Sequence, residues 1–184
     1  MNNKSSWTPV RGWESPAEQG LLSALATTVP LDGSIVEIGS EHGMSASIWV
    51  QYSKAAMITC IEINPKSEFL KNLRDAEIST KRIDWLLGSS QDVAIPTYLL
   101  ERGTDLLFID GDHSYDGAKA DLDRWSQHVN QNGIILVHDC ACSTNKQPHE
   151  QHYAVYSAVQ NFLAESGEWR VAFSVDTTMV LVRI

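Results

Sequence analysis

The 184-residue sequence has few cysteines and no long apolar run. Its three cysteines are too few and too oddly numbered for a disulfide framework, which fits a reducing cytoplasm. No stretch approaches the ~20 apolar residues that span a bilayer, and the first residues lack the apolar core of a signal peptide. These absences exclude a disulfide-stapled or membrane-spanning protein and predict a cytoplasmic one.

Basic residues are also in short supply, because 14 Lys and Arg face 23 Asp and Glu and give a formal net charge of -9. Nucleic-acid binding depends largely on neutralising phosphates with basic side chains. Here those side chains are scattered, with no run beyond Lys81-Arg82. The composition disfavours nucleic acid as a partner and favours a small, hydroxylated substrate.

Short apolar runs alternate with helix-length amphipathic segments along the chain. Continuously apolar runs belong to a parallel sheet covered on both faces, whereas the last two runs, only three residues apart, must pair antiparallel. The predicted strands are Ser34–Ile38, Met57–Glu62, Ile83–Leu87, Asp105–Asp110, Ile134–His138, Trp169–Ser174 and Thr178–Arg183. The predicted helices are Gly43–Ser53, Ser67–Ala76, Asp92–Glu101, Tyr115–Val129 and Tyr153–Ser166.

This alternation predicts a Rossmann-like α/β fold with a seven-stranded, mostly parallel sheet, an antiparallel last strand and helices on both faces. We expect a single domain over residues 1–184, with residues 1–30 as an amino-terminal extension and helix and residues 31–184 as the core. Trp7 and Trp13 in the extension would pack over a cofactor or at a homodimer interface, and the sequence leaves dimerisation open. In the helix predicted at Tyr115–Val129, Leu122 and Trp125 should face inward and charged residues, Asp121 among them, should face solvent.

Gly39 and Gly43 follow the first predicted strand and let the backbone turn tightly at the start of a helix. Their Gly-x-x-x-Gly spacing lacks the third glycine of dinucleotide-binding loops, which disfavours an NAD-dependent dehydrogenase. Glu37 places a carboxylate beside this loop, where the cationic sulfonium and amino group of S-adenosylmethionine would fit. Glu62, at the end of the second strand, can accept both hydroxyls of a ribose.

The third strand leads into another polar loop. Gly88 permits a turn, and Ser89, Ser90 and Gln91 offer donors and acceptors where the edge of an adenine would lie. The same residues, with Asp92, also suit an ordinary helix cap. Ligands of open α/β sheets bind beyond the carboxyl ends of the strands, so the three loops together predict one cofactor site.

Acidic residues and histidines follow the fourth and fifth strands: Asp110 and His113 in FIDGDHSYDG, and His138 and Asp139 in LVHDCAC. Hard oxygen ligands suit Mg²⁺ or Mn²⁺, and His113 could act as a general base. The two aspartates could instead cap helices. His138 could ligate a metal, act as a second base or simply pack at the strand end.

Four blocks, VEIGSEHGMSAS, ITCIEINP, GSSQDV and LLFIDGDHSY, occur in order between Ile35 and His138. Together they resemble class I methyltransferases of the catechol O-methyltransferase type, and the sugar and small-molecule O-methyltransferases related to macrolide and aminocoumarin tailoring enzymes. The resemblance implies S-adenosyl-L-methionine as cofactor and a divalent metal such as Mg²⁺. It implies His113 as the general base and Asp110 and Asp139 as metal ligands. The residues themselves add Asp110 to the predicted catalytic set and His138 to the predicted metal set. The cofactor-binding residues that it implies are Glu37, Gly39, Ser45, Glu62, Ser90 and Gln91. The loops around them add Ser40, Gly43, Ile63, Gly88, Ser89 and Asp110 to the predicted cofactor site.

Two competing functions deserve comparison with methyl transfer. A metal-dependent hydrolase or hydroxylase-like enzyme could use the Asp and His cluster, but it needs no adenosyl pocket. A non-catalytic S-adenosylmethionine-binding module would have no use for clustered acid–base groups. Cys140 and Cys142 form only half of a structural zinc motif, which disfavours zinc. The polar segment Cys142–His152 could cover the substrate side, with His149 and His152 as substrate contacts.

Overall fold

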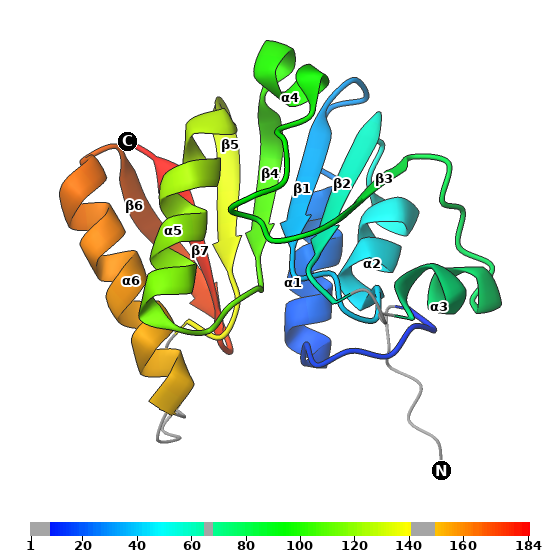
Figure 1. Cartoon of the computed structure of the whole chain (residues 1–184), viewed down its shortest axis with the longest axis horizontal. Coiled ribbons are helices and arrows are strands. Elements are labelled where there is room, and N and C mark those ends of the chain that lie inside the picture. The colour runs from blue at the N-terminus through cyan, green and yellow to red at the C-terminus, as the bar shows by residue number, and fades with distance from the viewer. Residues whose placement is uncertain (1–7, 65–67, 141–149) are drawn as a thin grey trace.

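The computed structural model describes residues 8–64, 68–140 and 150–184. Trp7, Cys142, His149 and most of the segment predicted to cover the substrate side lie outside these residues. The described elements form one seven-stranded sheet with helices on both faces (Figure 1). The strands are β1 (Ser34–Ile38), β2 (Met57–Glu62), β3 (Ile83–Leu87), β4 (Thr104–Ile109), β5 (Val129–Val137), β6 (Trp169–Val175) and β7 (Thr178–Arg183). The helices are α1 (Pro16–Ala26), α2 (Met44–Tyr52), α3 (Phe69–Asp75), α4 (Thr97–Arg102), α5 (Tyr115–Trp125) and α6 (Glu150–Ser166), with a 3-10 turn at Ser126–His128.

The strand order is β3-β2-β1-β4-β5-β7-β6. Strands β1 to β5 pair in parallel, and β7 lies antiparallel between β5 and β6. The predicted Rossmann-like fold with an antiparallel last strand is therefore confirmed. Apolar side chains explain the arrangement, because Ile35, Val36, Leu106 and Leu107 on the two central strands are fully buried.

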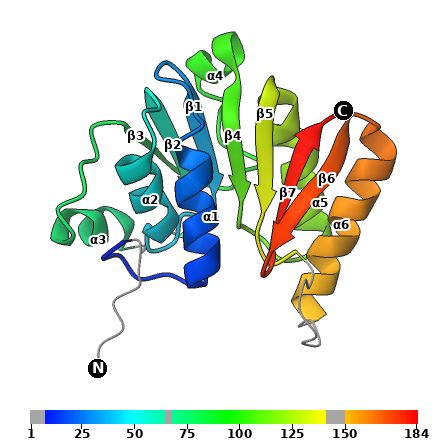
Figure 2. The ribbon, with the colours of Figure 1, turned by 180° about the vertical axis from the view of Figure 1, so that it is seen from behind.

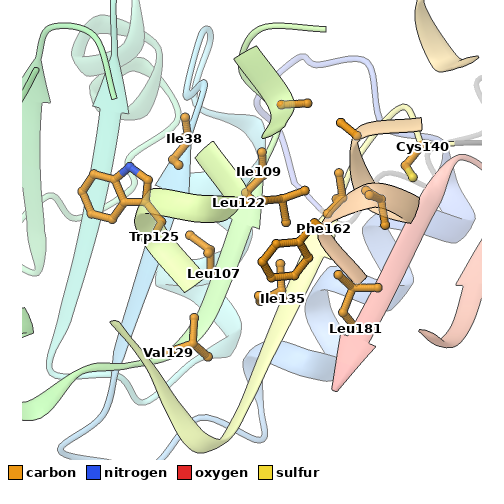
Figure 3. Close-up of a cluster of buried hydrophobic side chains, with 14 of the residues drawn as sticks. Ile38, Leu107, Ile109, Leu122, Trp125, Val129, Ile135, Cys140, Phe162 and Leu181 are labelled. Carbon is orange, nitrogen blue, oxygen red and sulfur yellow. The ribbon is translucent and has the colours of Figure 1, made fainter. Parts of the chain in front are cut away.

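Each face of the sheet has its own apolar core. Helices α1, α2 and α3 cover one face, which is turned toward the viewer in Figure 2. Helices α4, α5 and α6 cover the other, where Leu122 and Trp125 of α5 pack against Leu107 and Ile135 of the sheet (Figure 3). The inward orientation predicted for Leu122 and Trp125 is confirmed, and burial on both faces accounts for the continuously apolar central strands.

The strand order reverses between β1 and β4, which places a topological switch point at their carboxyl ends. The chain leaves β1 for α2 on one face and leaves β4 for α5 on the other. In α/β sheets a ligand crevice forms where successive connections diverge in this way. In Figure 1 this carboxyl edge is the lower edge, where the segment before α1 and the first turn of α6 also lie.

Three predicted element boundaries were wrong by four or more residues. The helix expected at Asp92–Glu101 begins only at Thr97, because Pro96 disfavours helical backbone before it and residues 92–93 turn back onto the Ser89 carbonyl. The helix expected to reach Val129 ends at Trp125 and tightens into the 3-10 turn. Strand β5 starts at Val129, five residues before the strand predicted at Ile134–His138.

Among the described helices, none is both long enough and apolar enough to cross a membrane.

Candidate active site

The turn after β1 is held against β4 by backbone contacts. Gly39 has φ +86°, and a Cβ there would lie 2.0 Å from the Asp110 carbonyl oxygen. Gly43 has φ +87° and stands immediately before the first residue of α2. Only glycine fits the first position without moving backbone. The sequence therefore folds into a close-packed cradle at the carboxyl edge, with the free N–H groups of α2 directed toward it.

Glu37 is fully buried at this turn. Its Oε2 accepts a 2.5 Å hydrogen bond from Trp49 Nε1, and its Oε1 has no hydrogen-bond partner among the described residues. Burial raises the pKa of Glu37 to about 8, although the nearby Ser40, Trp49 and Ser45 side chains lower it in part. Ser40 and Ser45 are themselves buried. The carboxyl group thus lies beneath the cradle rather than open to solvent.

Glu62, at the end of β2, is fixed by two backbone amides. Its Oε2 accepts from the Glu41 amide at 2.7 Å, and its Oε1 accepts from the Asn64 amide at 2.7 Å. A carboxylate has further lone pairs beyond these two bonds, so it can still accept the hydroxyls of a ribose. Its neighbour Ile63, also predicted to contact the cofactor, is 70% exposed.

The loop after β3 is anchored to α5. The Asp121 Oδ1 accepts from Ser90 Oγ at 2.6 Å and from Gln91 Nε2 at 2.5 Å, while Trp125 Nε1 donates to the Ser90 carbonyl at 3.1 Å. The expected solvent exposure of Asp121 was wrong, since its exposed fraction is 2%. Helix α5 packs over the Gly88–Gln91 loop. Helical spacing places Asp121 on the polar face of α5, but this loop covers that part of the face.

Asp110, His113 and Asp139 converge at the ends of β4 and β5. One ligand atom from each lies within 4.8 Å of the others. The His113 ring stands between the two carboxylates, with Nε2 3.4 Å from Asp110 Oδ1 and Nδ1 3.6 Å from Asp139 Oδ2. A hydrogen bond to Asp110 raises the pKa of His113 above its usual value, and its partial burial opposes this. These three side chains are close enough together to serve as ligands of a divalent cation.

His138 lies behind this group rather than within it. Its Nδ1 is 2.9 Å from Asp110 Oδ1, and its Nε2 is 3.5 Å from Glu18 Oε1 on α1. Burial would lower the pKa of His138, but the charge of Asp110 and the contacts with both carboxylates outweigh it and raise the pKa to about 11. Both ring nitrogens therefore face carboxylates within the protein.

The same pairing acts on the two carboxylates. Burial would raise the pKa of Asp110, yet the charge of His138 and the contacts with His113 and His138 lower it below its usual value. The pKa of Glu18 is likewise lowered despite burial, because His138 and the Ser15 amide stabilise its charged form. Glu18 Oε1 also accepts bonds from Thr177 and Thr178. A buried charge network thus ties α1 and the β6–β7 turn to Asp110.

Further residues lie near the site. His152 of α6 places Nε2 3.1 Å from Asp139 Oδ1, while the expected packing residue Trp13 is 80% exposed and donates to Glu41 Oε2. Glu14 and Glu18 were missed by sequence reasoning, since acidic residues at a helix start usually serve as caps. Glu18 does form a capping box with Ser15. Only the tertiary contacts of Glu18 reveal a second role.

A cavity of about 620 Å³ lies at the opposite edge of the sheet, where β1, β2 and β4 begin. Asp32, Tyr98, Arg102 and Asp105 are among its lining residues, and no predicted site residue lines it. The predicted residues gather instead at the carboxyl edge. An adenosyl amino acid fits this edge, which offers the glycine cradle, the fixed Glu62 and two buried oxygens. These oxygens, Glu37 Oε1 and Ser40 Oγ, have no hydrogen-bond partner among the described residues.

A family model described as a methyltransferase domain matches residues 36–140, more than half of the chain. The chain therefore belongs to this methyltransferase family, as the resemblance predicted. An uncharacterized protein of Acanthamoeba polyphaga mimivirus is 32% identical over 126 residues, which are 65% of this chain and 57% of that protein. The chain thus matches little more than half the length of that curated relative.

Solved structures share the whole fold. The cofactor-bound protein Rv0187 from MTB superimposes with a TM-score of 0.73 at 17% identity, over 97% of this chain and 84% of that one. An O-methyltransferase from Bacillus cereus in complex with SAH gives 0.68 at 16% identity, over 93% and 83%. TomG from Streptomyces achromogenes, an O-methyltransferase of tomaymycin synthesis in complex with SAM, gives 0.66 at 17% identity, over 94% and 82%. At these identities the likeness concerns the fold.

Proposed function

We propose that the chain is an S-adenosylmethionine-dependent O-methyltransferase that acts on a small hydroxylated molecule with the help of a divalent metal. The observation that carries the proposal is the convergence of the cofactor-type loops after β1, β2 and β3 with the Asp110, His113 and Asp139 group at one edge of the sheet. The O-methyltransferases from Bacillus cereus and Streptomyces achromogenes, solved with SAH and SAM, have the same fold and support the choice of cofactor.

The chain's own residues would hold the cofactor in three places. Glu62 would accept the ribose hydroxyls, since two backbone amides already fix its orientation. Ser90 and Gln91, held by Asp121, would border the adenine. The cradle at Gly39 and Gly43, with Ser45 beside it, would border the methionine portion. When bound, the cofactor would supply an electrophilic methyl group on a sulfonium sulfur.

Asp110 and Asp139 would hold a divalent cation that orients the substrate hydroxyl and lowers its pKa. His113 would accept the hydroxyl proton while the substrate oxygen forms its bond to the methyl carbon and the carbon–sulfur electron pair returns to sulfur. His138 would act from behind Asp110 by fixing its carboxylate. Because methyl transfer is an in-line displacement, most of the rate enhancement would come from positioning and electrostatics.

Calorimetric titration with S-adenosylhomocysteine tests the cofactor assignment. We expect Glu62→Gln to weaken binding by about tenfold to a hundredfold, because hydrogen bonds to a charged group contribute about 1.5–3 kcal/mol. Glu101→Gln, which removes an exposed carboxylate of α4, is the matched control and should bind like the wild type. If folded wild-type protein bound neither this ligand nor S-adenosylmethionine, the proposal would fail.

Titration with Mn²⁺, followed by the electron paramagnetic resonance signal of the free ion, tests the metal assignment. We expect Asp139→Asn to weaken Mn²⁺ binding by at least tenfold, because it removes one anionic oxygen ligand. Asp123→Asn, on the exposed side of α5 where it pairs with Lys119, should leave binding unchanged. Cofactor binding without Mn²⁺ binding would leave a metal-independent methyltransferase, and Mn²⁺ binding without cofactor binding would favour a metallohydrolase.

A further inference from the structure

The segment before α1 crosses the start of α2 at the carboxyl edge of the sheet (Figure 1). Thr8 Oγ1 lies 2.5 Å from Ser47 Oγ in α2, and Val10 is buried with its amide donating to Thr8 Oγ1 at 3.1 Å. These contacts fasten the segment next to the loop that carries Gly39 and Gly43. Side chains from this segment can therefore face the cradle at which α2 begins.

Glu14 is the acidic residue of this segment that turns back toward α2. A Cβ built on Gly12 would lie 2.6 Å from the Met44 Cβ and 2.8 Å from Glu14 Oε2. Gly12 thus lies against both the Glu14 carboxylate and Met44, the first residue of α2. Glycine at position 12 leaves the room that the carboxylate occupies.

Among the described residues, no basic side chain forms an ion pair with the buried Glu14 carboxylate. Glu14 is 8% exposed. Within the described part of the chain, its carboxylate accepts a hydrogen bond from its own backbone amide. Burial, followed by the charge of Asp110, raises its pKa. His138 is the cation nearby, but Asp110 and Glu18 already flank both of its ring nitrogens. A buried carboxylate in such surroundings costs free energy unless a positive group reaches it.

We propose that Glu14 binds the α-ammonium group of the cofactor's methionine portion. The inference rests on the proposed cofactor. An amino acid in the cradle presents a carboxylate and an ammonium group to the protein. The free amides at the start of α2 suit the carboxylate, and the Glu14 carboxylate beside Met44 suits the ammonium. In the free state burial disfavours the charged form of the Glu14 carboxylate, and the ammonium group of the ligand would stabilise that form.

Two ligands separate this role from a general effect on the site. S-Adenosylhomocysteine carries the amino acid portion, whereas 5′-methylthioadenosine has the adenosine and the thioether sulfur without it. In calorimetric titrations we expect Glu14→Gln to weaken binding of S-adenosylhomocysteine by about tenfold or more. Binding of 5′-methylthioadenosine should change less than twofold. Asp112→Asn, which removes an exposed charge at the same edge, is the matched control and should affect neither ligand.

The stability of the free protein supplies an independent readout. Because burial disfavours the charged form of Glu14, Glu14→Gln should leave the melting temperature of the ligand-free protein unchanged or higher. A merely structural role would lower the melting temperature and weaken both ligands alike, which would overturn the inference. Unchanged binding of S-adenosylhomocysteine would overturn it as well. A wild-type protein that bound neither ligand would overturn the proposed cofactor and this inference together, so the two failures are distinguishable.

Discussion

Replacing Gly39 with alanine tests whether the turn after β1 is built as tightly as the structure indicates. At φ +86°, an alanine adopts left-handed backbone, which costs about 1–2 kcal/mol. Its Cβ would also lie 2.0 Å from the Asp110 carbonyl oxygen and 2.6 Å from the carbonyl carbon. Both atoms belong to backbone and cannot rotate away, so β1 and β4 must separate locally.

The contact adds to the conformational cost. Overpacking of this kind costs about 1–3 kcal/mol, so Gly39→Ala should lower the free energy of unfolding by about 2–5 kcal/mol in total. For a domain of this size, each kcal/mol corresponds to about 2–4 °C in melting temperature. We therefore expect a melting temperature lower by roughly 5–20 °C. Binding of S-adenosylhomocysteine should be lost, because the displaced turn carries the cradle.

Gly167→Ala is the matched control for this experiment. Gly167 also has a positive φ, +62°, but nothing lies within 4 Å of a Cβ built there. It should show the conformational cost alone, about 1–2 kcal/mol. Urea unfolding of both variants at pH 7 measures the difference. If Gly39→Ala were no less stable than Gly167→Ala, the close approach of the β1 turn to Asp110 would be refuted.

The other predictions concern buried polar groups. The stability of the wild type should fall as pH rises from 4.5 to about 8, because burial raises the pKa of Glu37, and in urea unfolding Glu37→Gln should lose this dependence. A stability difference between these proteins that stays constant with pH would contradict the burial of that carboxyl group. Between pH 7 and 10 the His138→Gln variant should lose less stability than the wild type. The reason is that folding raises the pKa of His138 from 6.5 to about 11, so the wild type loses the stabilising imidazolium as pH rises. Parallel pH profiles of the two proteins would refute the pairing of His138 with Asp110 and Glu18. Asp121→Ala should weaken S-adenosylhomocysteine binding about tenfold by freeing Ser90, as calorimetry would show. Trp125→Phe should cost about 1 kcal/mol in urea unfolding through the lost bond to the Ser90 carbonyl, and an unchanged midpoint would argue against that bond.

The fold could be predicted from the sequence because the positions of the apolar runs follow directly from which strands the sheet buries. Strands β1, β2, β3 and β7 have the predicted bounds. Central strands buried on both faces must be continuously apolar, and a three-residue connection admits only an antiparallel pair. The helix after Ser89 was harder to predict. There Pro96 and backbone turns, rather than amphipathic spacing, decide where α4 begins.

The loops that carry the candidate site were also recognisable, but their internal connections were not. Strand order alone brings Asp110 and Asp139 to one edge. Nothing local in the sequence indicates that His138 is flanked by Glu18, more than a hundred residues away, or that Asp121 turns inward to Ser90. Such contacts depend on how α1 and α5 pack against the rest of the chain. The periodicity of a helix predicts its apolar and polar faces, but not which loop or helix lies against each face.

A crystal structure of the protein with S-adenosylhomocysteine would test the central claim most directly. The ligand should lie at the carboxyl ends of β1, β2 and β3, with its ribose hydroxyls on Glu62 and its adenine beside Ser90 and Gln91. A ligand bound instead in the cavity at the opposite edge, among Asp32, Tyr98 and Arg102, would contradict the proposed function.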